Sequence, residues 1–380
     1  MRPIQTTIAM IALAAAVALI HPGLIGPAMA QTGAIRIPVL VPLTGPLALE
    51  GTSQRNGAVM ALTDAPVGVR IEYEVLDTGA APETAVNALE RVLARGGVSV
   101  IVAPIFGAQM LAMLPIAAER KVPLITISGT AQLTEMGNPY VFRFFPNDSV
   151  AKTAHALYVV EALGKKRPAV LFQTTAYGQS GRQHLAANFA RLGATVVFEE
   201  GLDINLKDFL PALIKAKQAN ADALVLQLHA APTALLLRQA ASMGLGIPIV
   251  AGSAMHQPTT AALLQPAERK GVCAESASSP VSSIDPAVER WVAAYRREFG
   301  AEPDDFALTQ YDAVRMAIDA AVQGARGPEE MRAALASGNF TGLAMTYKSD
   351  GMGNMAHDAI IMCYDDQGRP RIDRRYPRLG

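Results

Sequence analysis

The sequence predicts an α/β protein in which two successive blocks each form a doubly wound parallel sheet. Short apolar, strand-like runs alternate with helical patterns from residue 35 onward. Several of these runs are apolar throughout, as strands are when helices cover both faces of a parallel sheet. The alternation falls into two blocks, roughly 34–145 and 146–275, and each has the size of one doubly wound domain.

The first block begins with a strand at 35–41 and a second strand at 69–76, which alternates apolar and polar residues. The following helix opens at Pro82, repeats apolar residues at helical spacing and closes at Gly96-Gly97. The remaining elements of this block are an apolar strand at 98–102, a helix at 108–120 and a strand at 123–127.

The second block repeats this order of strands and helices. Its strands are expected at 169–172, 195–199, 223–228 and 247–250. Its helices are expected after the first strand through residue 190, at 208–217 and at 232–243.

A third, helical block follows from about Asp285. Helices are expected at 286–299, 307–324 and 328–336, and strand-like runs at 343–348 and 359–364. A polar, Gly-rich turn at 349–354 separates the two runs, and it lacks the carboxylates that a calcium loop needs. The polar and basic residues at 367–380 are expected to form a peripheral C-terminal tail.

The N-terminus has the pattern of a secretory signal peptide over residues 1–30. Arg2 precedes a short apolar run from Ile8 to Ile20, and an A-x-A site ends at Ala30. The run is too short to span a bilayer, which takes about 20 residues. No cysteine follows Ala30 directly, so a lipid anchor is not expected. We predict export to the periplasm with cleavage near Ala30/Gln31.

Composition and motifs exclude several classes of function. The 380 residues include 33 basic and 33 acidic ones, a balance that excludes a strongly basic nucleic-acid-binding protein. The patterns G-x-G-x-x-G, P-loop and H-E-x-x-H are absent, and the six histidines are scattered. We therefore expect no cofactor, no metal, no catalytic residue and no nucleic-acid partner. The tetrapeptide from Ser149 to Lys152 matches S-x-x-K, and we interpret it as a helix start with a solvated lysine.

The two cysteines, Cys273 and Cys363, each lie in an apolar, strand-like run. In an oxidising compartment they are able to pair. Buried free thiols are the favoured interpretation, because the sequence does not show that their Cα atoms come within about 7 Å.

Three strand-to-helix loops are candidate binding loops, since open α/β sheets bind ligands at the carboxyl ends of their strands. Gly107 and Ala108, after the strand at 98–102, are able to present backbone N–H groups to a carboxylate. The other two loops are Ser128-Gly129-Thr130, with two hydroxyls, and Tyr177-Gly178, with an aromatic wall.

The order of these pieces resembles the periplasmic solute-binding proteins of ABC importers, type I fold, in the leucine/isoleucine/valine-binding family. Seven motifs occur in family order and together cover residues 34–365. They are Pro42–Pro46, Asp77–Pro82, Pro123–Thr130, Arg143 with Pro146-Asn147-Asp148, Ala176-Tyr177-Gly178, Leu237–Ala240 and Gln310–Ala313.

This resemblance implies two lobes joined by three crossover segments. Lobe 1 is expected to hold 34–145 and 276–342, and lobe 2 to hold 146–275 and 343–366. The ligand lies in the cleft between the lobes, which close around it by hinge bending. The loaded protein, expected to be a monomer, then docks on a membrane permease with its ATPase and performs no chemistry.

The family's ligand positions, carried over one by one, depart from the family pattern. The carboxylate-binding hydroxyl falls at Gly107, the cleft tyrosine at His229 and the acidic residue for a ligand ammonium at Ser253. An aromatic position falls at Glu50, which is able to supply the missing charge or to lie exposed in a loop. The expected site residues are Glu50, Phe106, Gly107, Ala108, Ser128, Gly129, Thr130, Tyr177, His229, Ser253 and Tyr311.

These departures leave the ligand open among a branched-chain amino acid, a small organic or aromatic acid and a neutral amide. Burying a ligand ammonium without its carboxylate partner weakens the free energy of binding by about 2–5 kcal/mol. His229 is equally compatible with donating to the ligand and with packing in the core. Two other functions compete with transport: a ligand-sensing receptor subunit of the same fold, and a cleft enzyme, which needs a nucleophile–base pair that the sequence does not show.

Overall fold

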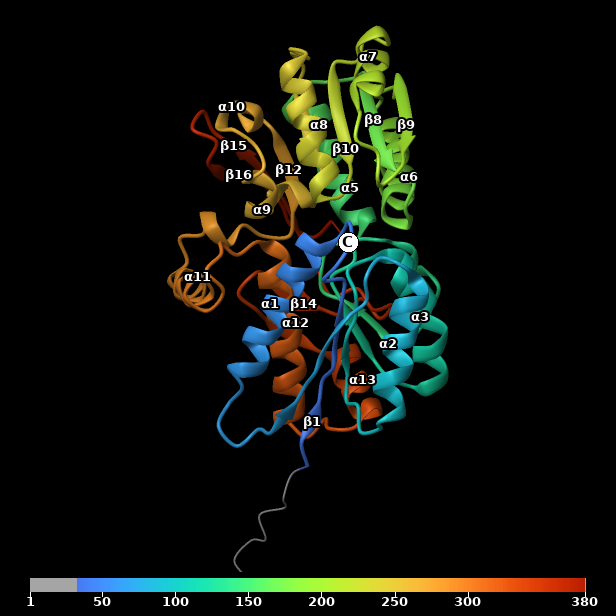
Figure 1. Ribbon diagram of the computed structural model, residues 1–380, viewed down its shortest axis with the longest axis vertical. Coiled ribbons are helices and arrows are strands. Elements are labelled where there is room, and N and C mark those ends of the chain that lie inside the picture. Colours follow the sequence, from blue (N-terminus) through green and yellow to red (C-terminus); the bar gives the residue numbers. More distant parts are fainter. Residues whose placement is uncertain (1–32, 380) are drawn as a thin grey trace, which may run out of the picture. The chain divides into compact units, whose positions relative to one another are not determined.

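The computed structural model describes residues 33–379, and the predicted signal segment at 1–30 lies outside them. Residues from Ala34 onward form one unit that contains two main sheets. One sheet has five strands and the other has seven. Each sheet, with the helices packed on it, forms a lobe, and we call the two the five-stranded lobe and the seven-stranded lobe. The predicted α/β class with two doubly wound lobes is confirmed (Figure 1).

The five-stranded sheet is parallel throughout. Its strands, in spatial order, are β4 (Val75–Asp77), β2 (Val39–Val41), β5 (Ile101–Val102), β6 (Leu124–Thr126) and β7 (Val141–Arg143). A separate parallel pair is formed by β1 (Ile35–Arg36), which comes just before β2 in the chain, and β3 (Ile71–Glu72), which comes just before β4.

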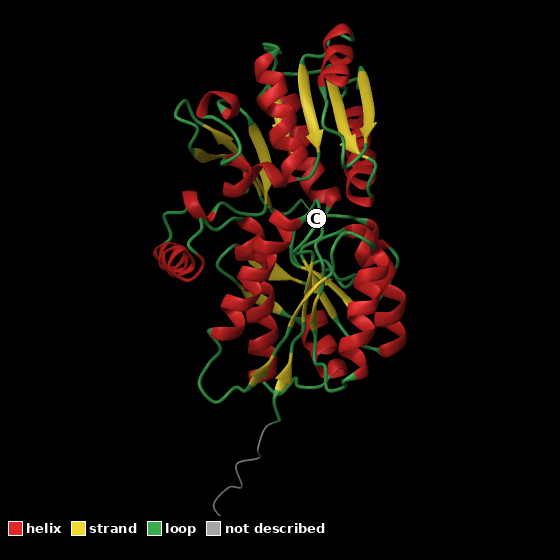
Figure 2. Cartoon of the chain, viewed as in Figure 1, coloured by secondary structure: helices red, strands yellow, loops and turns green. Residues whose placement is uncertain are grey.

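Helices cover both faces of this sheet (Figure 2). Alternate residues of β2 show why, because Val39 and Val41 pack into one hydrophobic cluster and Leu40 into another. The Leu40 side is covered by α2 (Pro82–Ala94) and α3 (Gly107–Arg120). The other side is covered by α1 (Ala48–Thr63), α11 (Pro286–Phe299), α12 (Asp305–Val322) and α13 (Pro328–Ser337).

The seven-stranded sheet has a parallel core and two antiparallel strands at one edge. In spatial order it holds β16 (Pro370–Tyr376), β15 (Ala359–Tyr364), β12 (Cys273–Ser276), β11 (Ile249–Ala251), β10 (Ala223–Gln227), β8 (Pro168–Gln173) and β9 (Phe198–Leu202).

Its two faces are also covered. One face carries α7 (Leu210–Gln218) and α8 (Ala230–Ser242), and the other carries α5 (Asp148–Leu157), the π-helical turn η1 (Tyr158–Ala162) and α6 (Ala176–Arg191). Short elements complete the fold: α4 (Gln132–Glu135), η2 (Ser253–His256), α9 (Pro258–Ala261), α10 (Pro266–Arg269), η3 (Pro280–Ser282), β13 (Asn339–Thr341) and β14 (Thr346–Lys348).

The chain crosses between the lobes three times: after β7, after β12 and before β15. The last crossing lies later than the predicted boundary at 342/343. Strand β14 pairs with β13, and Tyr347 and Met355 lie in the hydrophobic cluster of the five-stranded lobe. The buried Asp312 carboxylate holds this segment on α12 by accepting from the Tyr347 hydroxyl at 3.1 Å and from the Leu343 backbone N–H at 2.9 Å.

The expected polar tail at 367–380 contains the edge strand β16, so it is part of the sheet. Most of its side chains are exposed, because they lie on an edge strand where polar residues are tolerated. This strand was not predicted, because its sequence is mostly polar.

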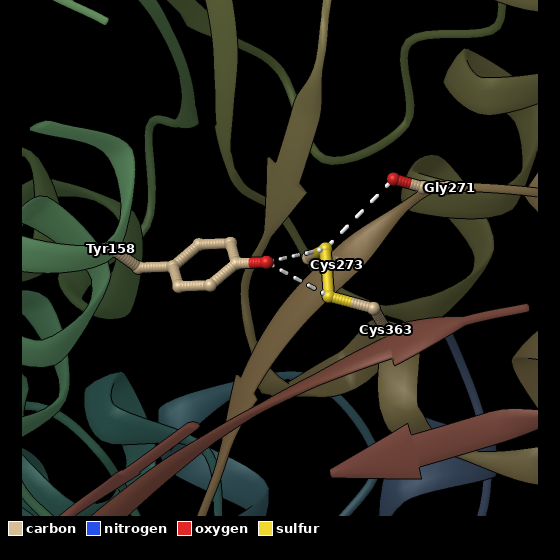
Figure 3. Close-up of a disulfide and its surroundings, with 4 residues drawn as sticks. All are labelled: Tyr158, Gly271, Cys273 and Cys363. Carbon is tan, nitrogen blue, oxygen red and sulfur yellow. Dashed lines mark hydrogen bonds between the residues drawn. A yellow bond between two sulfur atoms is a disulfide. The ribbon is translucent and has the colours of Figure 1, made fainter. Parts of the chain in front are cut away.

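The prediction of free thiols is wrong, because Cys273 and Cys363 form a disulfide (Figure 3). The two residues lie directly opposite each other in the antiparallel pair β12–β15, with their Cα atoms 4.0 Å apart. Each local run correctly indicated a strand, but the cysteines are 90 positions apart, and only the topology brings the two strands together. The Tyr158 hydroxyl lies 3.2 Å from the sulfur of Cys363.

Candidate functional site

A cavity lies where the carboxyl ends of the two parallel sheets face each other. Its volume is about 30 Å³. Both lobes line it, with the following residues: Glu50, Ile105, Ile127, Gly129, Phe145, Pro146, Asp148, Ala151, Tyr177, His229, Ser253, Ala254, Glu275 and Phe306. This is the position that open α/β sheets use for ligands.

Five of the predicted site residues line this cavity: Glu50, Gly129, Tyr177, His229 and Ser253. Gly129 and Tyr177 were predicted from loops that follow apolar strands, and Glu50, His229 and Ser253 from the family resemblance. The structure brings these residues of both lobes together. His229 is the N-cap residue of α8, and its ring lies 5.1 Å from the ring of Tyr177.

Five further predicted residues do not line the cavity. The Phe106 ring packs edge-on against His229, with ring centres 6.0 Å apart. Gly107 opens α3 and lies so close to Thr130 that a Cβ atom would meet the Thr130 hydroxyl at 2.1 Å. The hydroxyls of Ser128 and Thr130 are buried without a hydrogen-bond partner. Ala108 is half-buried in the first turn of α3.

Tyr311 lies away from the cavity. Its ring packs against Trp291 in the core of the five-stranded lobe, and its hydroxyl donates to the Asp64 carboxylate at 3.1 Å. Helix α12 turns that face toward α11, so the structure does not bring Tyr311 to the cavity.

Sequence reasoning missed two acidic lining residues, Asp148 and Glu275. Both are almost fully buried, with 1% and 2% of their surfaces exposed. A glutamate directly after the apolar run Val272–Ala274 was the available signal for Glu275, since a buried carboxylate needs a partner. Asp148 belongs to a recognised motif but had no assigned role.

A buried charge cluster explains how these acids are tolerated. Lys152 and His155, on the same face of α5 as Asp148, reach Glu275 of β12. The Lys152 ammonium donates to one Glu275 oxygen, and the His155 Nδ1 lies 2.9 Å from the other. Lys152 also lies 3.8 Å from Asp148. The interpretation of a solvated Lys152 is therefore wrong, because its side chain has no exposed surface.

Burial shifts the acid–base behaviour of this cluster. It lowers the pKa of Lys152 to about 8, which the nearby Asp148 carboxylate opposes. Burial and the Lys152 charge lower the pKa of His155 well below its ordinary value. Near neutral pH the cluster thus pairs one cation with the Asp148 and Glu275 carboxyl groups.

Glu50 links the two lobes. From the first turn of α1 it reaches across to α8, where one carboxylate oxygen accepts from the Ala230 backbone N–H at 2.9 Å. This contact matches a negative charge to a positive helix end. The other oxygen, Oε2, is buried without a partner. Burial raises the pKa of Glu50 to about 7.

Other contacts hold the lobes together beside the cavity. The Gln257 side chain donates to Asp304 at 2.8 Å, and the Ala131 backbone N–H donates to the Ser180 hydroxyl at 3.0 Å. Buried Arg143 fixes the loop at 128–131 by donating to the backbone carbonyls of that loop. The cavity is thereby enclosed by groups from both lobes.

A larger hollow, of about 590 Å³, lies elsewhere and includes Arg269, Arg369 and Arg371. It is open to solvent, and Arg369 is already paired with Asp365 at 3.1 Å. Its position away from the strand ends of the two parallel sheets makes it a weaker candidate for the ligand site.

Residues 33–379 contain no group of three or more His, Cys, Asp or Glu side chains arranged to hold a metal ion. Within the same residues, no helix has both the length and the apolar character needed to cross a membrane.

Two α/β lobes that enclose a small cavity at their strand ends define a two-lobed ligand-binding protein. A family model described as periplasmic binding protein matches residues 34–369, and the chain belongs to this family. The predicted family and type I fold are confirmed by this match and by the similar structures.

Three known proteins illustrate the similarity. A leucine-, isoleucine-, valine-, threonine- and alanine-binding protein of Pseudomonas aeruginosa is 29% identical over 56% of this chain and 58% of its own length. The solved leucine-binding protein LivK of Thermotoga maritima is 25% identical, with a TM-score of 0.82 over 90% of this chain and 99% of its own. An R. palustris ABC-transporter solute-binding protein in complex with benzoate is 20% identical, with a TM-score of 0.82 over 91% of this chain and 97% of its own.

Proposed function

We propose that this chain is the extracytoplasmic substrate-binding protein of an ABC importer. In this role it is exported to the periplasm, its signal segment is removed near Ala30, and it acts as a monomer. It captures a small solute between its lobes by hinge closure and delivers the solute to a membrane permease that works with an ATPase. It performs no chemistry itself.

The enclosed cavity is the observation that supports this function. Its walls come from both lobes, and Glu50 crosses from α1 to the N-terminus of α8. Separation of the lobes would break this hydrogen bond and the Gln257–Asp304 hydrogen bond, and it would open the cavity to solvent. This arrangement supports capture of the solute by closure of the lobes and its release by their opening.

The solute expected from the sequence bears a carboxylate and is a branched-chain amino acid or a related organic or aromatic acid. The hydroxyls of Ser128 and Thr130, which flank the lining residue Gly129, are buried without hydrogen-bond partners and support this expectation as free donors. The similar proteins named above have ligands of both kinds in their descriptions.

A thermal-shift screen of the purified mature protein tests the function. The panel should include amino acids, aliphatic and aromatic carboxylates, amides and amines. Since a ligand that binds only the folded protein stabilises it by mass action, we expect at least one compound to raise the melting temperature in a concentration-dependent way. Silence across all four classes would contradict capture of such solutes.

A further inference from the structure

The charged side chains that line the cavity are all acidic. Glu50, Asp148 and Glu275 line it, and no lysine or arginine appears among the described lining residues. His229 is the remaining titratable base in the lining, and burial lowers its pKa to about 4, so it is neutral near pH 7. A ligand carboxylate would thus meet no positive side chain at the cavity wall.

The three acids differ in how well they are compensated. Both oxygens of Glu275 are taken by Lys152 and His155. Asp148 shares Lys152 at 3.8 Å and accepts from the Gln227 side chain at 3.3 Å, but its Oδ2 is buried without a partner. Asp148 is therefore only partly compensated.

Glu50 has the weakest compensation. Its one ion-pair contact among the described residues is with the Nδ1 of His229 at 3.7 Å, and that ring is neutral near pH 7. Its Oε2 is buried and has no hydrogen-bond partner among residues 33–379. A buried carboxylate oxygen without a donor is costly, so this atom is the strongest acceptor that the cavity offers to a ligand.

Aromatic and aliphatic groups form the rest of the wall. Phe145, Phe306 and Tyr177 contribute rings, and Ile105 and Ile127 contribute aliphatic surface. The Lys152 ammonium already lies 5.6 Å from the centre of the Tyr177 ring, as aromatic faces attract cations. The apolar walls suit a hydrocarbon body. The wall chemistry matches a compact molecule with one positive group.

We propose that the cavity selects a small amine with an apolar body, whose ammonium group donates hydrogen bonds to Glu50 Oε2 and Asp148 Oδ2. This assignment rests on the proposed function, and it names the amino group rather than the carboxylate as the group that the cavity recognises. Glu50 then replaces the acidic residue whose expected position is occupied by Ser253.

A matched ligand series tests the assignment. Leucine, isopentylamine and 4-methylpentanoate share one hydrocarbon body and differ in which charged groups they carry. Benzylamine and benzoate form a second, aromatic pair. By calorimetry, we expect isopentylamine to bind within about tenfold of leucine, and 4-methylpentanoate at least about 30-fold more weakly. The same order is expected for benzylamine over benzoate.

The variant Glu50→Gln keeps the shape of the side chain and removes its charge. We expect it to weaken amine binding at least about 30-fold. The control Glu298→Gln changes an exposed glutamate of α11 and should leave binding unchanged. Unfolding of the ligand-free variants, followed by circular dichroism, separates lost binding from lost folding.

The pH dependence gives an independent readout. The groups that face Glu50 are His229 and the Ala230 N–H from α8, Asp304 at the start of α12, and Tyr177 of α6. Since the pKa of Glu50 is about 7, the carboxyl is mostly protonated at pH 6 and mostly ionised at pH 8. Isopentylamine stays protonated over this range, so its affinity should rise about tenfold from pH 6 to pH 8 in the native protein. The rise should be clearly smaller in Glu50→Gln, where Lys152, with a pKa of about 8, remains beside Asp148.

The outcomes are distinguishable. Tight binding of 4-methylpentanoate or benzoate, with no binding of the amines, would overturn the amine assignment and leave the capture function intact. Unchanged amine affinity in Glu50→Gln, with a normally folded variant, would also overturn it. Silence of all five compounds would count against both the assignment and the capture of such solutes.

Discussion

Lys152 lies fully buried between Asp148 and Glu275, one helical turn after Asp148 on α5. Removing one partner of a buried charge cluster leaves the others uncompensated, which is much more costly than losing a surface pair. We expect Lys152→Met to lower the free energy of unfolding by about 3–5 kcal/mol. Urea unfolding near pH 7 measures this change.

The matched control is Lys215→Met, which removes an exposed lysine paired with Glu200 at 3.0 Å. An exposed pair of this kind contributes at most about 1 kcal/mol. Equal losses of stability in the two variants would show that Lys152 is not the central charge of a buried cluster.

At the scale of residues, the sequence predicted loop positions better than chemical environments. Gly129 and Tyr177 were predicted at the site because they follow apolar strands, and the end of a strand is a local property. Lys152 and Tyr311 were misjudged because their surroundings come from distant segments: β12 for Lys152, and α1 and α11 for Tyr311. Burial of a charge is set by tertiary packing, which one sequence does not show.

Helix α1 is one of the elements that the sequence analysis did not anticipate. Its residues include two glycines and several small or polar side chains, so it lacks a clear apolar face. The structure explains the glycine at position 57, since a Cβ atom there would lie 2.0 Å from the Ala307 backbone oxygen of α12. The two helices approach closely at this point, and α1 then carries Glu50 to the cavity.

This close approach predicts a stability effect without a change of charge. We expect Gly57→Ala to lower the free energy of unfolding by about 1–3 kcal/mol, because the added methyl group has no space. Thr63→Ala, at an exposed position of the same helix, should change it by less than about 0.5 kcal/mol. Chemical unfolding of both variants measures the difference, and a stabilised Gly57→Ala variant would refute the close packing.

Elements formed by continuous apolar runs were predicted well, including the strands that became β6, β8 and β10. Edge elements were not, because β16 lies at an edge and most of its side chains are exposed. The disulfide escaped prediction for a related reason: the pairing of β12 with β15 is a property of the topology.

At the scale of the whole molecule, the two doubly wound lobes follow from the two blocks of alternating strands and helices. The third block returns to the five-stranded lobe, and the chain then crosses back to complete the seven-stranded sheet. This threading was expected from the family resemblance rather than from periodicity. It places residues as far apart as Glu50 and Glu275 on the same cavity.

A crystal structure of the protein with a ligand identified in the screen tests the central claim most directly. We predict ligand density in the cavity lined by Glu50, Tyr177 and His229, with the Glu50–Ala230 hydrogen bond retained between closed lobes. Ligand density in the arginine-containing hollow at Arg269, together with an empty cavity between the lobes, would contradict the account.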